Sequence, residues 1–185
     1  MMRKIAEALF GKSSGFVEHM VAQWIEDLRN NPNDWETWAA LGSAYGKLRR
    51  YDEAVASFSK AIEVNPKYAE AYLGLASTYG FLGRTQDKIA ACKQAVKLKP
   101  EYAEAHATLG AAYGAAGQYK EAINALREAL RLQPELHQAR YALGVAYLTS
   151  GDNAAALREA RTLDPVDPSL GRELHDLMRK WADAR

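Results

Sequence analysis

The side chains in this sequence that are best suited to metal binding or nucleophilic catalysis are four histidines and one cysteine. The histidines are scattered, without a ligand-like neighbour at helical spacing: His19, His106, His137 and His175. Cys92 is the only thiol, so the chain has no disulfide framework and no multi-thiolate metal site. The sequence has no glycine-rich phosphate loop and no identifiable catalytic triad. We therefore expect no enzyme activity, no metal site and no cofactor.

Charge and hydropathy argue against nucleic-acid binding and against a membrane-spanning function. Lysine and arginine total 24 and aspartate and glutamate 23, so the formal net charge of +1 gives no long-range attraction to nucleic acid. One basic stretch has acidic residues beside it and is interpreted as a solvated face: Lys88, Lys93, Lys97 and Lys99. No segment approaches the roughly 20 apolar residues of a membrane helix, and the apolar run from Ile5 to Phe10 is too short for a secretory signal. The sequence predicts a cytoplasmic protein.

Proline, tyrosine and leucine recur along the chain with a common spacing of 34 residues. The three series are Pro32, Pro66, Pro100 and Pro134; Tyr45, Tyr79, Tyr113 and Tyr147; and Leu41, Leu75, Leu109 and Leu143. A period of this length is typical of solenoids built from repeated supersecondary units. When a unit begins at Trp35, the chain divides into units 35–68, 69–102 and 103–136 and a shorter unit 137–166.

Each unit has the pattern of two antiparallel helices. In the first unit Trp38, Leu41 and Tyr45 are three and four residues apart, which places them on one face of a helix. Glycines on this stripe let the second helix approach closely: Gly42, Gly110 and Gly144. Other glycines stand where the first helix must stop: Gly83, Gly117 and Gly151. The second helix buries Ala54, Phe58 and Ala61 in one unit and Ala122, Leu126 and Ala129 in another, and proline ends it.

These columns together resemble the tetratricopeptide repeat (TPR), through Trp38-Ala-Ala-Leu41-Gly42-Ser-Ala-Tyr45, Ala54-x-x-x-Phe58 and Pro66. The resemblance covers residues 35–166. Its departures are Ala76 for glycine, Lys88 for alanine, and Cys92, Leu126 and Ala160 at the position of Phe58. Cys92 is therefore interpreted as a buried small apolar group. The resemblance implies an all-α, right-handed α-solenoid of stacked antiparallel helix pairs, a TPR superhelix that binds other polypeptides.

The segments outside the repeats are expected to close the stack. Residues 15–34 form an N-terminal packing helix, or half repeat, through the stripe Met20, Trp24 and Leu28. Residues 167–185 form a capping helix, with an apolar face inward and charged residues outward. The tail, residues 1–14, has three interpretations: a short amphipathic helix docked in a groove of this or a neighbouring copy, a weak peripheral membrane contact, or a disordered end.

In this family the first helices of successive units line a concave groove. Carried over column by column, the resemblance implies that a partner contacts Glu36, Ser43, Lys47, Glu70, Leu73, Ser77, Phe81, Glu104, Ala111, Tyr141, Val145 and Leu148. The groove is shallow in the first three units and becomes apolar toward the last. The hypothesis is that an amphipathic helix or extended peptide lies there with its apolar side down.

Two features of this groove have competing interpretations. A row of glutamates either faces basic residues of the partner or is favoured by the helix dipole: Glu36, Glu70 and Glu104. A row of glycines either admits a partner backbone or relieves helix crowding: Gly46, Gly80 and Gly114.

The resemblance also argues against one class of partner. Family members that bind chaperone C-termini use a clamp of Lys, Asn and Arg, whereas the corresponding columns hold Ala39, Ser43, Leu73, Ser77, Ala107 and Ala111. The leading function is an adaptor or scaffold for a partner protein of unknown identity. The alternative is a structural protein whose tail or repeat faces join copies into homo-oligomers.

Overall fold

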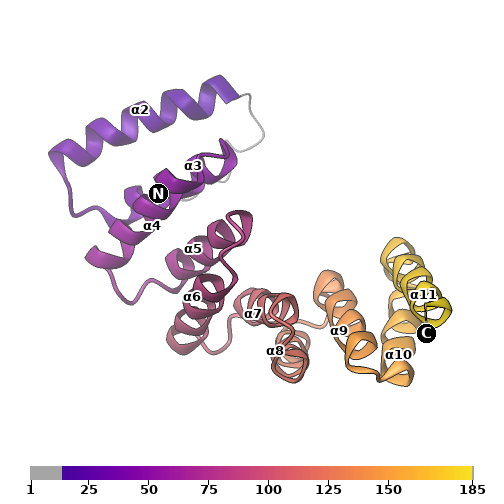
Figure 1. The fold of residues 1–185 in the computed structure, drawn as a ribbon. Coiled ribbons are helices and arrows are strands. Elements are labelled where there is room, and N and C mark those ends of the chain that lie inside the picture. Colours follow the sequence, from indigo (N-terminus) through magenta and orange to yellow (C-terminus); the bar gives the residue numbers. More distant parts are fainter. Residues whose placement is uncertain (1–13, 185) are drawn as a thin grey trace. The chain divides into compact units, whose positions relative to one another are not determined.

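The computed structural model describes residues 14–184, which form ten α-helices and no β-strand. Figure 1 shows the helices in chain order, from α2 in indigo to α11 in yellow. They are α2 (Ser14–Asn30), α3 (Trp35–Lys47), α4 (Tyr51–Val64), α5 (Ala69–Phe81), α6 (Thr85–Leu98), α7 (Ala103–Ala115), α8 (Tyr119–Leu132), α9 (His137–Ser150), α10 (Asn153–Leu163) and α11 (Pro168–Asp183). The predicted all-α class of stacked helix pairs is confirmed. The predicted tail lies outside the described residues, apart from Ser14 at the start of α2.

The chain forms two compact units, which are described separately. The first ends at Leu98 and contains α2 to α6, and the second begins at Lys99 and contains α7 to α11. Within each unit, consecutive helices pack as pairs, with α3 on α4, α5 on α6, α7 on α8 and α9 on α10. Between residues 14 and 184, no helix is both long and apolar enough to cross a membrane.

The core of the first unit is organised around the ring of Phe58 on α4. A Cβ atom added to Gly42 on α3 would lie 2.9 Å from this ring, and one added to Gly74 on α5 would lie 2.5 Å from it. The ring therefore packs between two glycines from different helices, and only hydrogen atoms at these positions leave room for it. The close approach at Gly42 was predicted from its column, whereas Gly74 was not singled out.

The N-terminal helix α2 packs on α3 and completes this core. Its buried residues Val21, Trp24 and Leu28 are one or two turns apart, and Met20 packs against them. The segment predicted to pack on the first pair is a helix, and its apolar stripe contacts that pair. Because an isolated helix pair cannot bury its apolar face, α2 adds to the first pair a second neighbour besides α5.

The second unit repeats this packing and then departs from it at its last helix. Gly110 on α7 faces Leu126 of α8, at 2.5 Å from an added Cβ, as the repeat pattern predicts. A Cβ added to the equivalent Gly144 on α9 would lie nearest to Leu174 of α11. Among its three nearest atoms, the only one from α10 is the Cβ of Glu159, at 3.4 Å. The predicted capping helix thus occupies the place at Gly144 that a second-helix side chain was expected to fill.

The turns inside the helix pairs share one backbone conformation. Gly83, Gly117 and Gly151 have φ of 69°, 74° and 93°, the left-handed region that ends a helix, as predicted from their column. The equivalent residue of the first pair is Arg49, with φ of 60°. A side chain in this region is strained by about 1–2 kcal/mol relative to glycine, so the first turn is built less favourably than the other three.

Candidate partner-binding surfaces

The exposed side of α3 and α5 carries seven of the predicted binding residues and is called the first-unit face. It consists of Glu36, Ser43, Lys47, Glu70, Leu73, Ser77 and Phe81. On each helix these positions recur at intervals of three, four or seven residues, so they lie along one side of it. Because α3 and α5 contact each other within the first unit, the two rows form a single surface.

The middle of the first-unit face is smooth and polar. Ser43 is half-buried and Ser77 is exposed, and each hydroxyl donates a 3.0 Å hydrogen bond to the carbonyl one turn earlier on its own helix. These hydroxyls are therefore satisfied without a partner. A Cβ added to Gly46 would meet nothing within 4 Å, and one added to Gly80 would make only ordinary contact with Lys88. Helix crowding explains neither glycine.

The acidic end of the first-unit face lies at the start of α3 and α5. Asp34 caps α3, because its Oδ1 accepts hydrogen bonds from the backbone N–H groups of Glu36 and Thr37 at 3.1 and 3.2 Å. Glu36 is exposed and Glu70 is half-buried in the first turn of α5. A carboxylate at this place is stabilised by the helix dipole, so the acidic row has a structural role whether or not a partner uses it.

The opposite end of the first-unit face is aromatic and cationic. Phe81 is 69% exposed at the end of α5, and its ring stacks on that of Tyr51 at the start of α4, with 5.0 Å between centroids and 8° between planes. The Nζ of Lys88 lies 3.4 Å from the position of a Cβ on Gly80. Lys47 ends α3, and partial burial lowers the pKa of its ammonium group. The sequence reasoning missed Tyr51, which is 30 residues from its stacking partner.

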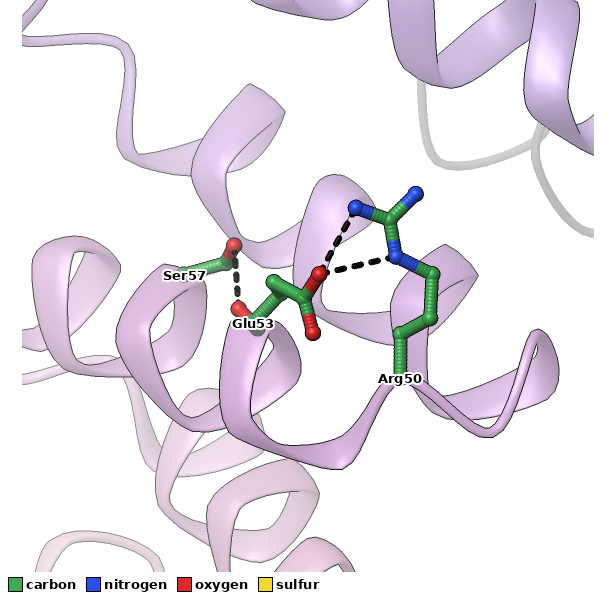
Figure 2. Close-up of polar contacts among 3 residues, drawn as sticks. All are labelled: Arg50, Glu53 and Ser57. Carbon is green, nitrogen blue, oxygen red and sulfur yellow. Dashed lines mark hydrogen bonds and ion pairs between the residues drawn. The ribbon is translucent and has the colours of Figure 1, made fainter.

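Arginine and carboxylate pairs brace the turn beside this aromatic end. Arg50 donates to Oε1 of Glu53 through Nε at 2.9 Å and Nη2 at 2.7 Å, and Ser57 donates to the Glu53 carbonyl at 2.8 Å. Figure 2 shows these three residues and the hydrogen bonds between them. These hydrogen bonds raise the pKa of Arg50 and lower the pKa of Glu53. The Arg50 guanidinium also covers the ring of Tyr45 at 4.5 Å.

The same arrangement recurs 34 residues later in the first unit. Arg84 donates to Asp87 at 2.7 Å and lies 4.5 Å above the ring of Tyr79. At the corresponding place in the second unit the cation is replaced by Gln118. Each of the two guanidinium groups is already bound by a carboxylate of its own turn, so they act in the turn rather than as anion receptors.

The second-unit face, on α7 and α9, was predicted to bind through Glu104, Ala111, Tyr141, Val145 and Leu148. Glu104 and Ala111 are exposed on α7. Tyr141 and Val145 are half-buried against a cluster from α10 and α11 that includes Leu163 and Leu170.

The apolar part of the second-unit face is therefore largely occupied. The hydroxyl of Tyr141 donates a 2.9 Å hydrogen bond to Oε1 of Glu173 on α11, and burial together with this carboxylate raises the Tyr141 pKa to about 12. Leu148 is 1% exposed, so it offers no side-chain surface to a partner in this structure. Tyr141 and Val145 pack within the unit, because α11 brings an apolar stripe of its own.

Three of the residues considered for chemistry are buried or contact an oxygen of their own chain. Cys92 is fully buried, as predicted, and burial raises the pKa of its thiol to about 11, which opposes formation of the reactive thiolate. His106 hydrogen-bonds the carbonyl of Pro100 at 2.8 Å, and His175 lies 3.2 Å from Asp164. Among residues 14–184, no three His, Cys, Asp or Glu side chains are grouped so that they could hold a metal ion.

Three family models match this sequence. Two described as tetratricopeptide repeat match residues 35–68 and 57–90, and one described as TPR repeat matches residues 115–151. A search of curated protein sequences finds no match.

Solved structures with the same fold cover most of the chain. A crystal structure of MamA is 25% identical, with a TM-score of 0.76 over 90% of this chain and 92% of that one. YrrB, described as a TPR protein with an unusual peptide-binding site, is 19% identical, with a TM-score of 0.77 over 94% and 89%. The first TPR of Spaghetti (RPAP3), bound to the HSP90 peptide SRMEEVD, is 26% identical, with a TM-score of 0.62 over 63% and 92%.

Proposed function

The chain belongs to the tetratricopeptide-repeat family, and we propose that it is a non-catalytic scaffold that binds a peptide or helix of a partner protein. The observation that carries this proposal is the first-unit face, where small side chains and an exposed aromatic ring lie on adjacent first helices. Cys92 is buried, and His106 and His175 each contact an oxygen of their own chain, which favours a binding role.

The open glycine positions support close contact with a partner. Since the space beside Gly46 is empty and Gly80 is exposed, a peptide backbone or a helix could approach α3 and α5 closely. A partner that laid an amphipathic helix or an extended strand across the two helices would bury Leu73 and Phe81 with its apolar side. Two of the structural neighbours are described as peptide-binding, and this supports the same mode for this chain.

The test is an affinity pull-down from native extract with the full chain as bait. Ser77→Arg places a long cation in the centre of the first-unit face, while Ser59→Arg makes the same change on α4, outside that face. We expect specific partners to be lost from the Ser77→Arg bait and retained by the Ser59→Arg bait, with both baits keeping the wild-type circular dichroism. If both baits retained the same partners equally, the first-unit face would not be the binding surface.

Self-assembly is the competing function, in which the chain binds another copy of itself instead of a partner protein. Sedimentation velocity of the purified full chain over a hundredfold range of concentration separates the two. The scaffold proposal expects a monomer at all concentrations. Association that grows with concentration and is abolished by Ser77→Arg would mean that the first-unit face receives another copy of this chain.

A further inference from the structure

We propose that Tyr51 is a positioning residue of the first-unit face, and that it holds the ring of Phe81 in place to receive an apolar side chain of the partner. The two rings are called the stacked pair. The inference rests on the proposed function, because it names the group of the partner that this scaffold would bind. Tyr51 belongs to α4, so it lies outside the helices from which the groove was predicted.

The stacked pair joins the start of one helix to the end of the next. Tyr51 is the first residue of α4, and Phe81 is the last residue of α5. Their ring centroids are 5.0 Å apart and their planes differ by 8°, which is a stacked arrangement. Tyr51 is half-buried, whereas Phe81 remains 69% exposed. Tyr51 therefore supports the Phe81 ring without closing it off from a partner.

A ring that is held in this way is better prepared for binding than a ring that moves freely. An exposed side chain loses rotamer freedom when a partner covers it, and this loss opposes binding. Contact with Tyr51 restricts the Phe81 ring before a partner arrives, so less freedom remains to be lost. Aromatic side chains are also enriched at protein interfaces. We therefore expect Tyr51 to raise the affinity for a partner through its effect on Phe81.

The group that complements the stacked pair is apolar. Arg50 directly precedes the first ring in the chain and donates to Glu53 at 2.7 and 2.9 Å. Arg84 follows the second ring by three residues and donates to Asp87 at 2.7 Å. Both cations are therefore paired within their own turns, and the accessible surface of the pair is a hydrocarbon ring. An apolar side chain that covers this ring removes apolar surface from water, whereas a charged group would have to be dehydrated there.

The second unit keeps the tyrosine of this pair but not the ring that stacks on it. Tyr51 corresponds to Tyr119, and Phe81 corresponds to Thr149. The hydroxyl of Thr149 donates a 2.9 Å hydrogen bond to the carbonyl of Val145 on its own helix. Tyr119 is therefore a matched control for Tyr51, since it is also half-buried and has the same place in the repeat, but position 149 offers it no ring.

The experiment measures affinity for peptides that are selected from a random display library on the immobilised full chain. Each selected peptide is titrated by fluorescence polarisation, together with versions in which its apolar residues are replaced by alanine. We expect Phe81→Ala to weaken binding about tenfold or more, and Tyr51→Ala to weaken it about three- to tenfold. Tyr51→Phe keeps the stacked rings and should bind like the wild type, and so should Tyr119→Ala. At least one apolar residue of the peptide should lose its effect on affinity in the Phe81→Ala variant.

A double variant separates positioning from a general effect on the fold. If Tyr51 acts through the Phe81 ring, adding Tyr51→Ala to Phe81→Ala should cause no further loss of affinity. All variants should keep the wild-type circular dichroism. If Tyr51→Ala fails to fold, Tyr51→Leu, which keeps apolar bulk without a flat ring, takes its place in both measurements.

Three results would overturn the role of the stacked pair while the scaffold proposal stands. The selected peptides would bind Phe81→Ala or Tyr51→Ala as tightly as the wild type, or they would bind the double variant more weakly than Phe81→Ala, or their apolar residues could be replaced by alanine without loss. Failure of the wild-type chain to select any peptide would count against both proposals.

Discussion

The first-unit and second-unit faces are built from the same repeat columns, but equivalent positions are exposed in the first and wholly or partly buried in the second. Ser77 and Gly80 are exposed on α5, whereas the equivalent residues on α9, Val145 and Leu148, are half-buried and buried. The second-unit positions carry large apolar side chains, and Val145 packs against the cluster that α11 completes. The comparison teaches that a repeat position faces outward only if the elements that follow it leave it uncovered.

The largest expected effect comes from weakening the helix that closes the second unit. Leu174 is fully buried and packs on Gly144, so Leu174→Ala leaves a cavity and should lower the free energy of unfolding by about 2–5 kcal/mol. Urea denaturation followed by circular dichroism measures this loss. Phe81→Ala, which removes an exposed ring from the first-unit face, should change the same quantity by less than about 0.5 kcal/mol. Equal losses of unfolding free energy in the two variants would contradict the difference between the buried and the exposed position.

Two glycine substitutions compare a position that faces another side chain with a position that faces open space. Gly144→Ala places a methyl group against Leu174 and should destabilise the protein by about 1–3 kcal/mol. Gly114→Ala, in the same unit, meets nothing within 4 Å and should be neutral or stabilising by up to about 1 kcal/mol, because alanine favours helix. Thermal unfolding of both variants gives the sign. A stabilising Gly144→Ala would show that α11 does not pack as described.

The hydrogen bond from Tyr141 to Glu173 tests how α11 is held to α9. Tyr141→Phe removes it and should cost about 0.5–1.5 kcal/mol. The Tyr141 pKa is raised from 10.0 to about 12 in the folded protein. The unfolded chain therefore loses this proton first, so the stability contribution is complete below pH 10 and is lost as the pH rises toward 12. An ultraviolet titration that shows wild type and Tyr141→Phe differing only by a tyrosine of ordinary pKa would contradict this.

The smallest expected effect concerns the turns of the two units. Arg49 has the backbone conformation that glycine holds at Gly117. Arg49→Gly removes steric strain of about 1–2 kcal/mol but adds freedom to the unfolded chain worth about 0.5–1 kcal/mol. The net result should be a stabilisation of about 0.5–1 kcal/mol, measured by chemical denaturation. Arg127→Gly, an exposed position inside α8, should instead destabilise the protein, since glycine disfavours helix.

The repeat period was enough to predict the helix pairs, because it locates both the glycine turns and the prolines. Packing of α2 through Trp24 and of α11 through Leu174 also followed, since each helix carries an apolar stripe. The burial of Leu148 could not be predicted in this way. This burial depends on how neighbouring helices pack against α9, and no residue column of the repeat predicts that packing.

The binding face was predicted less completely than the fold. Helix periodicity placed Ser77 and Phe81 on one side of α5, but it says nothing about contacts between residues on different helices. The stack of Phe81 on Tyr51 joins α5 to α4 and became visible only once the pairs were packed. Gly46 was open to two interpretations until the space around it was known.

The ring of Phe58 between Gly42 and Gly74 has a consequence for how this sequence can change. A smaller side chain at position 58 opens a void facing two helices at once, and a methyl group at either glycine collides with the ring. Neutral drift is therefore blocked at each of the three positions taken singly. A viable replacement requires coordinated substitution on α3, α4 and α5, so these residues would be inherited as a set.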